Sequence, residues 1–269
     1  MKKLHFSYHM HSAFDGPVTA HSFTLRCFPK SNELQKIVRI KKEILPADWL
    51  CDAVDSFGND YIYGKTERRH DSFFVQVEGE TRICRTEGQG LCGSCPPGGR
   101  YPTKLTLCSK EMCCFAAKFQ KKWYKGGRRT GAFRDMIYDL MEKIYHYMLY
   151  TPGSTHTRTA AQEAFAMGKG VCQDYAHIMI ALCRKLSIPA AYVAGFMCGE
   201  GASHAWVAVG DEETNLWYEI DPTNCRWVDE TYIMVSHGMD AADCIMNKGI
   251  YRGVAAETQS VTVIVEEII

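Results

Sequence analysis

The chain has 269 residues, of which 46% are hydrophobic and 23% are charged, so it can bury a sizeable core and lacks the composition of a disordered protein. Its 31 basic residues balance its 31 acidic residues, which leaves no net field to attract nucleic acid or an anionic membrane. No apolar run reaches the roughly 18 residues that span a bilayer, and residues 1–11 lack the apolar stretch of a secretory signal. We therefore expect a cytoplasmic protein that has neither a nucleic-acid nor a membrane partner.

The thirteen cysteines are an odd number, so at least one has no disulfide partner within the chain. Without a secretory signal, this count favours reduced and mostly buried thiols. Cys92 and Cys95 form one C-x-x-C pair, but Cys113 and Cys114 downstream are adjacent and lack the spacing of a second pair. A structural zinc at four thiolates is therefore an alternative, and free thiols in a linker are the favoured interpretation.

Residues 1–85 are predicted to form a β-rich N-terminal domain. Apolar and polar residues mix at strand-like length in 23–28 and in 72–77, and a turn composition separates them at 55–60. Residues 86–130 follow as a connecting region that is rich in Cys, Gly and Pro up to about 103 and basic at 121–129. We expect the basic stretch to be solvated rather than a binding patch.

Helical patterns begin at about residue 109. Apolar residues recur at helical spacing across 133–150, and Pro152-Gly153 ends that helix. Residues 159–162 have a capping-box pattern that starts a short helix, which Gly168 ends. A further helix is predicted from about 172 to 186, with an apolar stripe on one side.

Strand patterns then replace the helical ones, at 191–196, 203–209, 217–221 and 260–265. Helices followed by strands predict an α+β fold for residues 131–269, beside the N-terminal β domain and with the last strand as a C-terminal extension.

Cys172 stands apart from the other cysteines because of its position. It follows Gly-Lys-Gly-Val at 168–171 and begins the predicted helix. A helix N-terminus presents unpaired backbone N–H groups and the positive end of the helix dipole, and both favour a thiolate over a thiol. The thiolate is the nucleophilic form of cysteine, and the flanking glycines leave room for a substrate to approach.

His204 and Asp221 supply the two other groups that such a nucleophile needs. His204 begins one predicted strand and Asp221 ends the next, just before Pro222. Adjacent antiparallel strands place such ends side by side, where a cysteine on a facing helix can meet them. An imidazole would then exchange protons with the thiol, and the carboxylate would orient the imidazole. Taken singly, each residue also fits a structural role; their order and context together favour a triad.

These segments resemble the motifs of the bacterial transglutaminase-like proteins, often called transglutaminase-like cysteine peptidases. The similarity lies in the nucleophile motif at 170–177 (Gly-Val-Cys-Gln-Asp-Tyr-Ala-His), the histidine motif at 203–207, the aspartate motif at 221–224 and the lead-in at 150–155. Residues 55–59 are similar to the β-rich N-terminal region of that family, and 237–243 and 249–253 to its C-terminal segment. The segments at 86–103 and 121–130 depart from the pattern.

The resemblance implies a papain-like α+β core in which the helix that carries Cys172 packs on an antiparallel sheet. It implies that Cys172 attacks a peptide or carboxamide carbonyl, that His204 transfers the proton and that Asp221 holds the imidazole. A thioester would then pass to water or to an amine, with hydrolysis favoured, and the backbone N–H of Cys172 is a reasonable oxyanion donor. We expect a peptide or protein substrate and no cofactor or metal. His177, one turn beyond Asp174, is expected to be structural.

A non-catalytic module that uses the same scaffold to bind a protein partner is the alternative function. An intact set of cysteine, histidine and aspartate argues against it.

Overall fold

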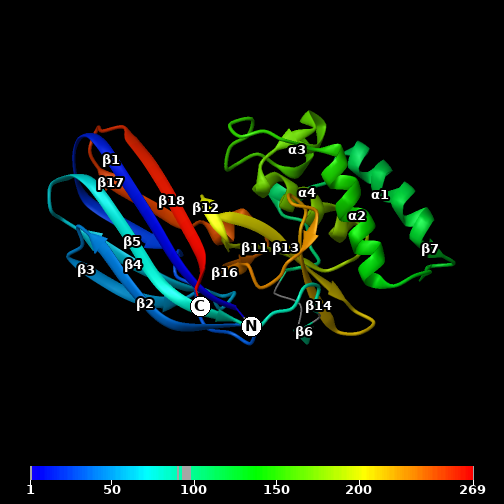
Figure 1. Cartoon of the computed structure of the whole chain (residues 1–269). Coiled ribbons are helices and arrows are strands. Elements are labelled where there is room, and N and C mark those ends of the chain that lie inside the picture. The colour runs from blue at the N-terminus through cyan, green and yellow to red at the C-terminus, as the bar shows by residue number, and fades with distance from the viewer. Residues whose placement is uncertain (1, 90, 93–97, 269) are drawn as a thin grey trace.

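The structure of the chain, a computed structural model, describes residues 2–89, 91–92 and 98–268. The molecule has a β-rich part that contains both chain ends and a second part in which helices cover a smaller sheet (Figure 1). The predicted α+β class is therefore confirmed. No helix among the described residues is long and apolar enough to cross a membrane.

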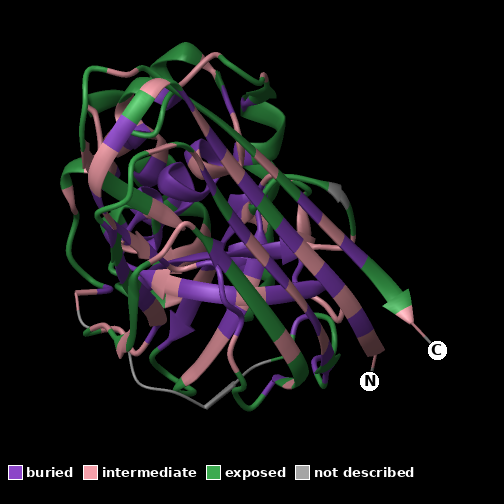
Figure 2. Ribbon diagram, turned by 90° about the vertical axis from the view of Figure 1, so that its left-hand side faces the viewer, coloured by how far each residue is buried: buried purple, intermediate pink, exposed green. Residues whose placement is uncertain are grey.

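The β-rich part is organised around one strand of 24 residues. Its strands are β1 (Lys2–Leu25), β2 (Gln35–Leu45), β3 (Trp49–Val54), β4 (Asp60–Thr66), β5 (His70–Ile83), β12 (Gly199–Gly201), β17 (Asn247–Arg252) and β18 (Glu257–Ile268). The first half of β1 pairs with β5 and β18, and its second half pairs with β4 and β17. Buried and partly exposed residues alternate along β1 (Figure 2), because successive side chains of a strand point to opposite faces.

The C-terminal strand belongs to the N-terminal sheet, although the sequence pattern had grouped it with the catalytic core. β18 pairs with β1 in an unbroken antiparallel register, from Lys3 opposite Ile268 to Phe14 opposite Glu257. Val263 and Val265 of β18 are buried in the same apolar cluster as the inward side chains of β1. The chain thus returns at its end to complete the domain with which it began.

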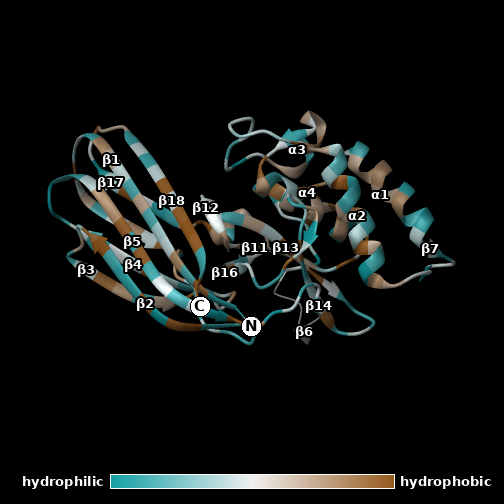
Figure 3. Ribbon diagram, in the orientation of Figure 1, coloured by the Kyte–Doolittle hydropathy of each residue, from teal (hydrophilic) through white to brown (hydrophobic). Residues whose placement is uncertain are grey.

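In the described residues, the second part consists of four α-helices and an antiparallel sheet. The helices are α1 (Lys110–Trp123), α2 (Phe133–Tyr147), α3 (Ala161–Met167) and α4 (Cys172–Lys185). The sheet has the order β15-β14-β13-β11-β16, and β6 (Leu91–Cys92) pairs with β14. Its strands are β11 (Ala190–Met197), β13 (His204–Asp211), β14 (Leu216–Asp221), β15 (Arg226–Trp227) and β16 (Tyr232–Gly238). Hydrophobic and hydrophilic residues alternate along α1 and α2 (Figure 3), as expected of helices with one buried face.

Helix α4 is the centre of this second part. All but its first two residues and its last are buried, and α1, α2, α3, β11 and β13 all contact it. The predicted connecting region therefore contributes to the core, because Met112, Ala116 and Phe119 of α1 lie in the same apolar cluster as α4. The basic stretch near 121–129 forms the end of α1 and a short hairpin, β7 (Tyr124–Lys125) with β8 (Arg128–Arg129).

Shorter elements complete the chain. They are the 3-10 helices at Lys104–Thr106 and Ala241–Cys244, and the parallel pair β9 (Leu149–Tyr150) and β10 (Lys169–Gly170). Helix α3 ends as predicted at Gly168, whose φ of 63° is left-handed. Its start differs: Ala160 is the N-cap, and its backbone N–H donates to Glu163 at 2.8 Å, while the Thr159 hydroxyl accepts from His156 instead. Cys95 of the C-x-x-C pair lies outside the described residues.

Candidate active site

Cys172 is the first residue of α4, as the sequence predicted. The preceding residue, Val171, has extended backbone angles and is the N-cap, so the free N–H groups of the first turn lie at the cysteine. The Cys172 side chain is half-buried and packs against the edge of the core cluster. The thiol is therefore at the surface end of a buried helix.

Asp174 fixes the start of this helix. Its Oδ2 accepts hydrogen bonds from the Val171 backbone N–H at 2.8 Å and from the Thr155 hydroxyl at 2.6 Å. Burial raises the pKa of Asp174, and these two hydrogen bonds act in the opposite direction. Gly170 makes the approach possible, since a Cβ there would lie 2.6 Å from the Asp174 side chain. The aspartate of the cysteine motif thus connects the lead-in loop to the helix that carries the thiol.

His204 lies between the two other predicted residues. It begins β13, and its Nε2 is 2.7 Å from Asp221 Oδ2. Burial alone would lower the pKa of His204, but hydrogen bonds to Asp221 and Cys172, together with their charges, raise that pKa to about 10. Cys172 is the second side chain that contacts the His204 ring. The structure therefore brings all three predicted residues together.

Asp221 ends β14 and is completely buried. Its Oδ2 accepts from His204, from the Asn224 side chain at 2.7 Å and from the Tyr232 hydroxyl at 2.8 Å. Its Oδ1 accepts from the backbone N–H groups of Thr223 at 2.9 Å and Asn224 at 3.3 Å. Burial raises the pKa of Asp221, but donors led by His204 outweigh it and hold the pKa below its usual range. Such a carboxylate is ionised and can stabilise a protonated imidazole.

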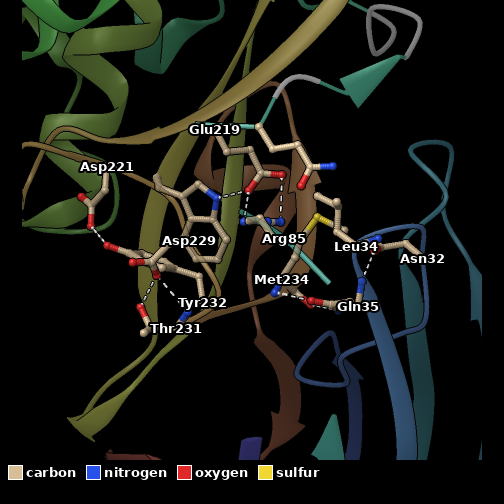
Figure 4. A network of polar contacts seen from close by, with 12 residues as sticks. Asn32, Leu34, Gln35, Arg85, Glu219, Asp221, Asp229, Thr231, Tyr232 and Met234 are labelled. Carbon is tan, nitrogen blue, oxygen red and sulfur yellow. Dashed lines mark hydrogen bonds and ion pairs between the residues drawn. The ribbon is translucent and has the colours of Figure 1, made fainter. Parts of the chain in front are cut away.

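Tyr232 is a site residue that the sequence did not identify. It begins β16, where it pairs with Met197 of β11, and its hydroxyl donates to Asp221 (Figure 4). Only the tertiary packing brings Tyr232 to the carboxylate, so the sequence around it could not predict the contact.

His177 has the structural role that was expected. It is completely buried, and its Nε2 accepts from the Ala241 backbone N–H at 3.1 Å. Burial lowers the pKa of His177 to about 4, which keeps its ring neutral. Among the described residues, no group of three His, Cys, Asp or Glu side chains could hold a metal ion.

Known protein families match this chain in the region that contains the three residues. Residues 124–222, which include Cys172, His204 and Asp221, match the transglutaminase-like superfamily, and residues 4–82 match the bacterial transglutaminase-like N-terminal region. An uncharacterized protein of Mycobacterium leprae is 35% identical over 275 residues, which cover 93% of each chain. The chain belongs to the transglutaminase-like superfamily.

Another relative and a solved structure are also similar to this chain. An uncharacterized protein of Mycobacterium tuberculosis is 35% identical over 130 residues, covering 43% of this transglutaminase-like chain and 41% of its own. The crystal structure of a candidate cysteine protease from Cytophaga hutchinsonii has a TM-score of 0.78 and 20% identity, over 99% of this chain and 91% of that one. The likeness shows that the two proteins share one fold along the whole length of this chain.

Proposed function

We propose that this transglutaminase-like protein is a cysteine-dependent acyl-transfer enzyme that acts on peptide or carboxamide bonds. The observation that carries the proposal is the geometry of the site: Cys172 begins α4, and His204 Nε2 lies 2.7 Å from the buried carboxylate of Asp221. The contacts of His204 with Asp221 and Cys172 raise its pKa to about 10. An imidazole with that pKa is protonated at neutral pH, so it stabilises a thiolate beside it and holds a proton ready for the leaving group.

The reaction then has two halves. In the first, Cys172 Sγ attacks the carbonyl carbon, and the oxyanion faces the backbone N–H groups at the start of α4. His204 gives its proton to the leaving amine or ammonia, the C–N bond breaks and a thioester remains. In the second, neutral His204 takes a proton from the incoming nucleophile, which displaces Cys172 and releases the acyl group.

Water is the favoured nucleophile in the second half. The side chain of Cys172 is partly exposed, so water can reach a thioester that forms on it. Transfer to an amine requires a site that keeps water away from the thioester. We therefore propose a hydrolase, a peptidase or amidase, rather than a crosslinking enzyme, with a peptide or protein as its substrate.

The deciding experiment supplies the full-length protein with a glutamine-containing peptide and a labelled primary amine. Release of ammonia or of peptide fragments without incorporation of the label is expected. Incorporation would identify amine transfer instead. Cys172→Ser should abolish both activities, whereas Cys114→Ser, at an exposed thiol of α1, should retain them. Equal activity in the two variants would contradict the proposal.

The alternative is a non-catalytic module that binds a protein partner through the same scaffold. Alkylation by iodoacetamide separates the two functions, because the exposed thiols of Cys51, Cys84 and Cys114 serve as internal references. Catalysis predicts preferential labelling of Cys172 near neutral pH and its loss in His204→Ala. Slow and uniform labelling of all accessible thiols would favour the module.

We also propose that the protein works in the reducing cytoplasm. Eleven cysteines among the described residues are free, which fits such a compartment. Mass spectrometry of protein alkylated directly in lysed cells should find these thiols reduced; disulfides among them would contradict the proposed location.

A further inference from the structure

A chain of buried polar contacts leads from the end of the N-terminal domain toward His204, and Figure 4 shows its first contact, between Arg85 and Glu219. It begins at Arg85, two residues after β5, whose side chain is only 4% exposed. Two guanidinium nitrogens of Arg85 contact the two carboxylate oxygens of Glu219, at 2.8 and 3.3 Å. This two-point contact fixes the orientation of Glu219 as well as its charge.

Glu219 in turn orients the side chain of Trp206 through a hydrogen bond. The indole Nε1–H donates to Glu219 Oε2 at 2.8 Å, which is the same oxygen that Arg85 contacts at the shorter distance. Trp206 is completely buried, and an indole has only this one hydrogen-bond donor. The plane of the ring is therefore set by a carboxylate that an arginine from the other domain holds in place.

The indole of Trp206 lies beside His204 and beside Tyr232, the tyrosine that donates to Asp221. Its ring centroid is 6.3 Å from that of His204, two residues earlier in β13, with the planes 28° apart. It also meets the ring of Tyr232 edge to face at 5.4 Å, and Tyr232 donates to Asp221. Movement of this one ring would therefore disturb the imidazole and the carboxylate together.

The neighbouring strand leaves a space shaped for this ring. Gly195 of β11 pairs directly opposite His204, and a Cβ at Gly195 would lie 2.5 Å from the indole of Trp206. The glycine thus lets the indole pack against the backbone beside the histidine, where any other residue would displace it.

We propose that Arg85, Glu219 and Trp206 are positioning residues of the active site, so that the N-terminal domain completes the catalytic machinery of the core. The inference rests on the proposed function, since it assigns these residues to the orientation of His204 against Cys172. None of the three needs to touch the substrate. Their effect is on the fraction of molecules in which the imidazole is aligned for proton transfer, and a small misalignment of a catalytic group lowers turnover strongly.

Arg85→Gln in the full-length protein tests the inference, with Arg129→Gln as its matched control. Arg129 forms an ion pair of the same kind with Asp211 at the opposite end of β13, at 3.0 Å and with side-chain exposures of 12% and 4%. Both variants lose a buried arginine–carboxylate pair, at Glu219 of β14 or at Asp211 of the adjacent strand β13, so both should unfold at lower temperature. Only the change at Arg85 interrupts the contacts that lead to His204.

The expected result for Arg85→Gln is a fall of about tenfold or more in kcat with little change in KM, because a lost charge-assisted hydrogen bond is worth at least that factor. The alkaline limb of its pH profile should also move toward neutral pH. Arg85→Lys, which keeps the charge, should recover part of the activity, and Arg129→Gln should keep the kcat of the unmodified protein. Equal kcat values and pH profiles in Arg85→Gln and Arg129→Gln would overturn the inference.

Two further measurements keep the test decisive. If Arg85→Gln does not fold, Trp206→Phe replaces it, since phenylalanine keeps an aromatic ring and loses the N–H; unchanged kcat and pH profile would again overturn the inference. If the unmodified protein turns over no substrate, the proposed function fails, and NMR titration of the His204 imidazole decides the inference by itself. A His204 pKa that moves in Arg85→Gln and not in Arg129→Gln supports it, and one that moves in neither overturns it.

Discussion

Replacement of Asp221 by asparagine should show what the charge of this residue contributes to the site, because the shape of the side chain is almost unchanged. Every partner of the carboxylate is a donor: His204, the Asn224 side chain and Tyr232 on Oδ2, and the backbone N–H groups of Thr223 and Asn224 on Oδ1. An amide must turn its NH2 toward one of these two groups. In either orientation, the NH2 group of the asparagine therefore faces at least two other donors. The volume of the side chain is almost the same as that of aspartate.

The size of the effect follows from the pKa of His204. A rise from 6.5 to about 10 is 3.5 units, and at 1.36 kcal/mol per unit it favours the imidazolium in the folded protein by about 5 kcal/mol. Asp221 and Cys172 share this stabilisation. A neighbouring opposite charge contributes about 1–3 units, so Asp221→Asn should lower the pKa of His204 by about that amount.

The sign of the accompanying change in stability follows from linkage. Because the pKa of His204 is higher in the folded than in the unfolded protein, its contribution is complete below about pH 6.5 and is lost as the pH rises through about 10. The Asp221→Asn protein should therefore unfold more easily than the unmodified protein at pH 7. The part of this stability difference that comes from the charge of His204 should shrink toward pH 10.

NMR titration of labelled histidine measures the pKa directly. Burial lowers the pKa values of His21 and His177 to about 4, whereas the pKa of His204 is raised, so we expect the signal of His204 to titrate near pH 10. Tyr232→Phe is the control, because it removes a hydrogen bond to Asp221 and keeps the negative charge. If His204 still titrates near pH 10 in Asp221→Asn, the carboxylate is not the cause of the shift and the reasoning is refuted.

Three further perturbations test the surroundings of the site. Tyr232→Phe should lower the free energy of unfolding by about 1.5–3 kcal/mol at pH 7, because it removes a hydrogen bond to an ionised carboxylate. This loss should shrink as the pH falls through the lowered pKa of Asp221. An unchanged urea midpoint at pH 7 would contradict the prediction. Gly170→Ala should displace Asp174, which should lower kcat and lower the free energy of unfolding by about 1–3 kcal/mol. Gly201→Ala is the control, because a Cβ at Gly201 meets nothing within 4 Å, and it should change neither quantity. Equal effects of the two variants would refute the role of the contact between Gly170 and Asp174. Treatment with a chelator should leave turnover unchanged, because the proposed steps use only thiol, imidazole and carboxylate; loss of turnover that calcium restores would disprove this.

The local sequence determined the parts of the site that depend on neighbours along the chain. The start of α4 at Cys172 and the end of α3 at Gly168 follow from glycine positions and helical periodicity, which act over a few residues. The places of His204 and Asp221 at the ends of adjacent strands follow from alternation and a short connection. These local signals, with the family motifs, were sufficient to predict the three residues that the structure brings together.

Only the tertiary structure decided which distant residues support that site. Arg85 and Glu219 are 134 positions apart, and Tyr232 reaches Asp221 of β14 from β16, which lies at the opposite edge of the sheet. The C-terminal strand β18 pairs with β1, at the other end of the chain, and does not join the sheet of β11, β13 and β14. Such contacts depend on the free energy of burying whole faces against one another, and an alternating strand pattern shows that a face will be buried without showing its partner.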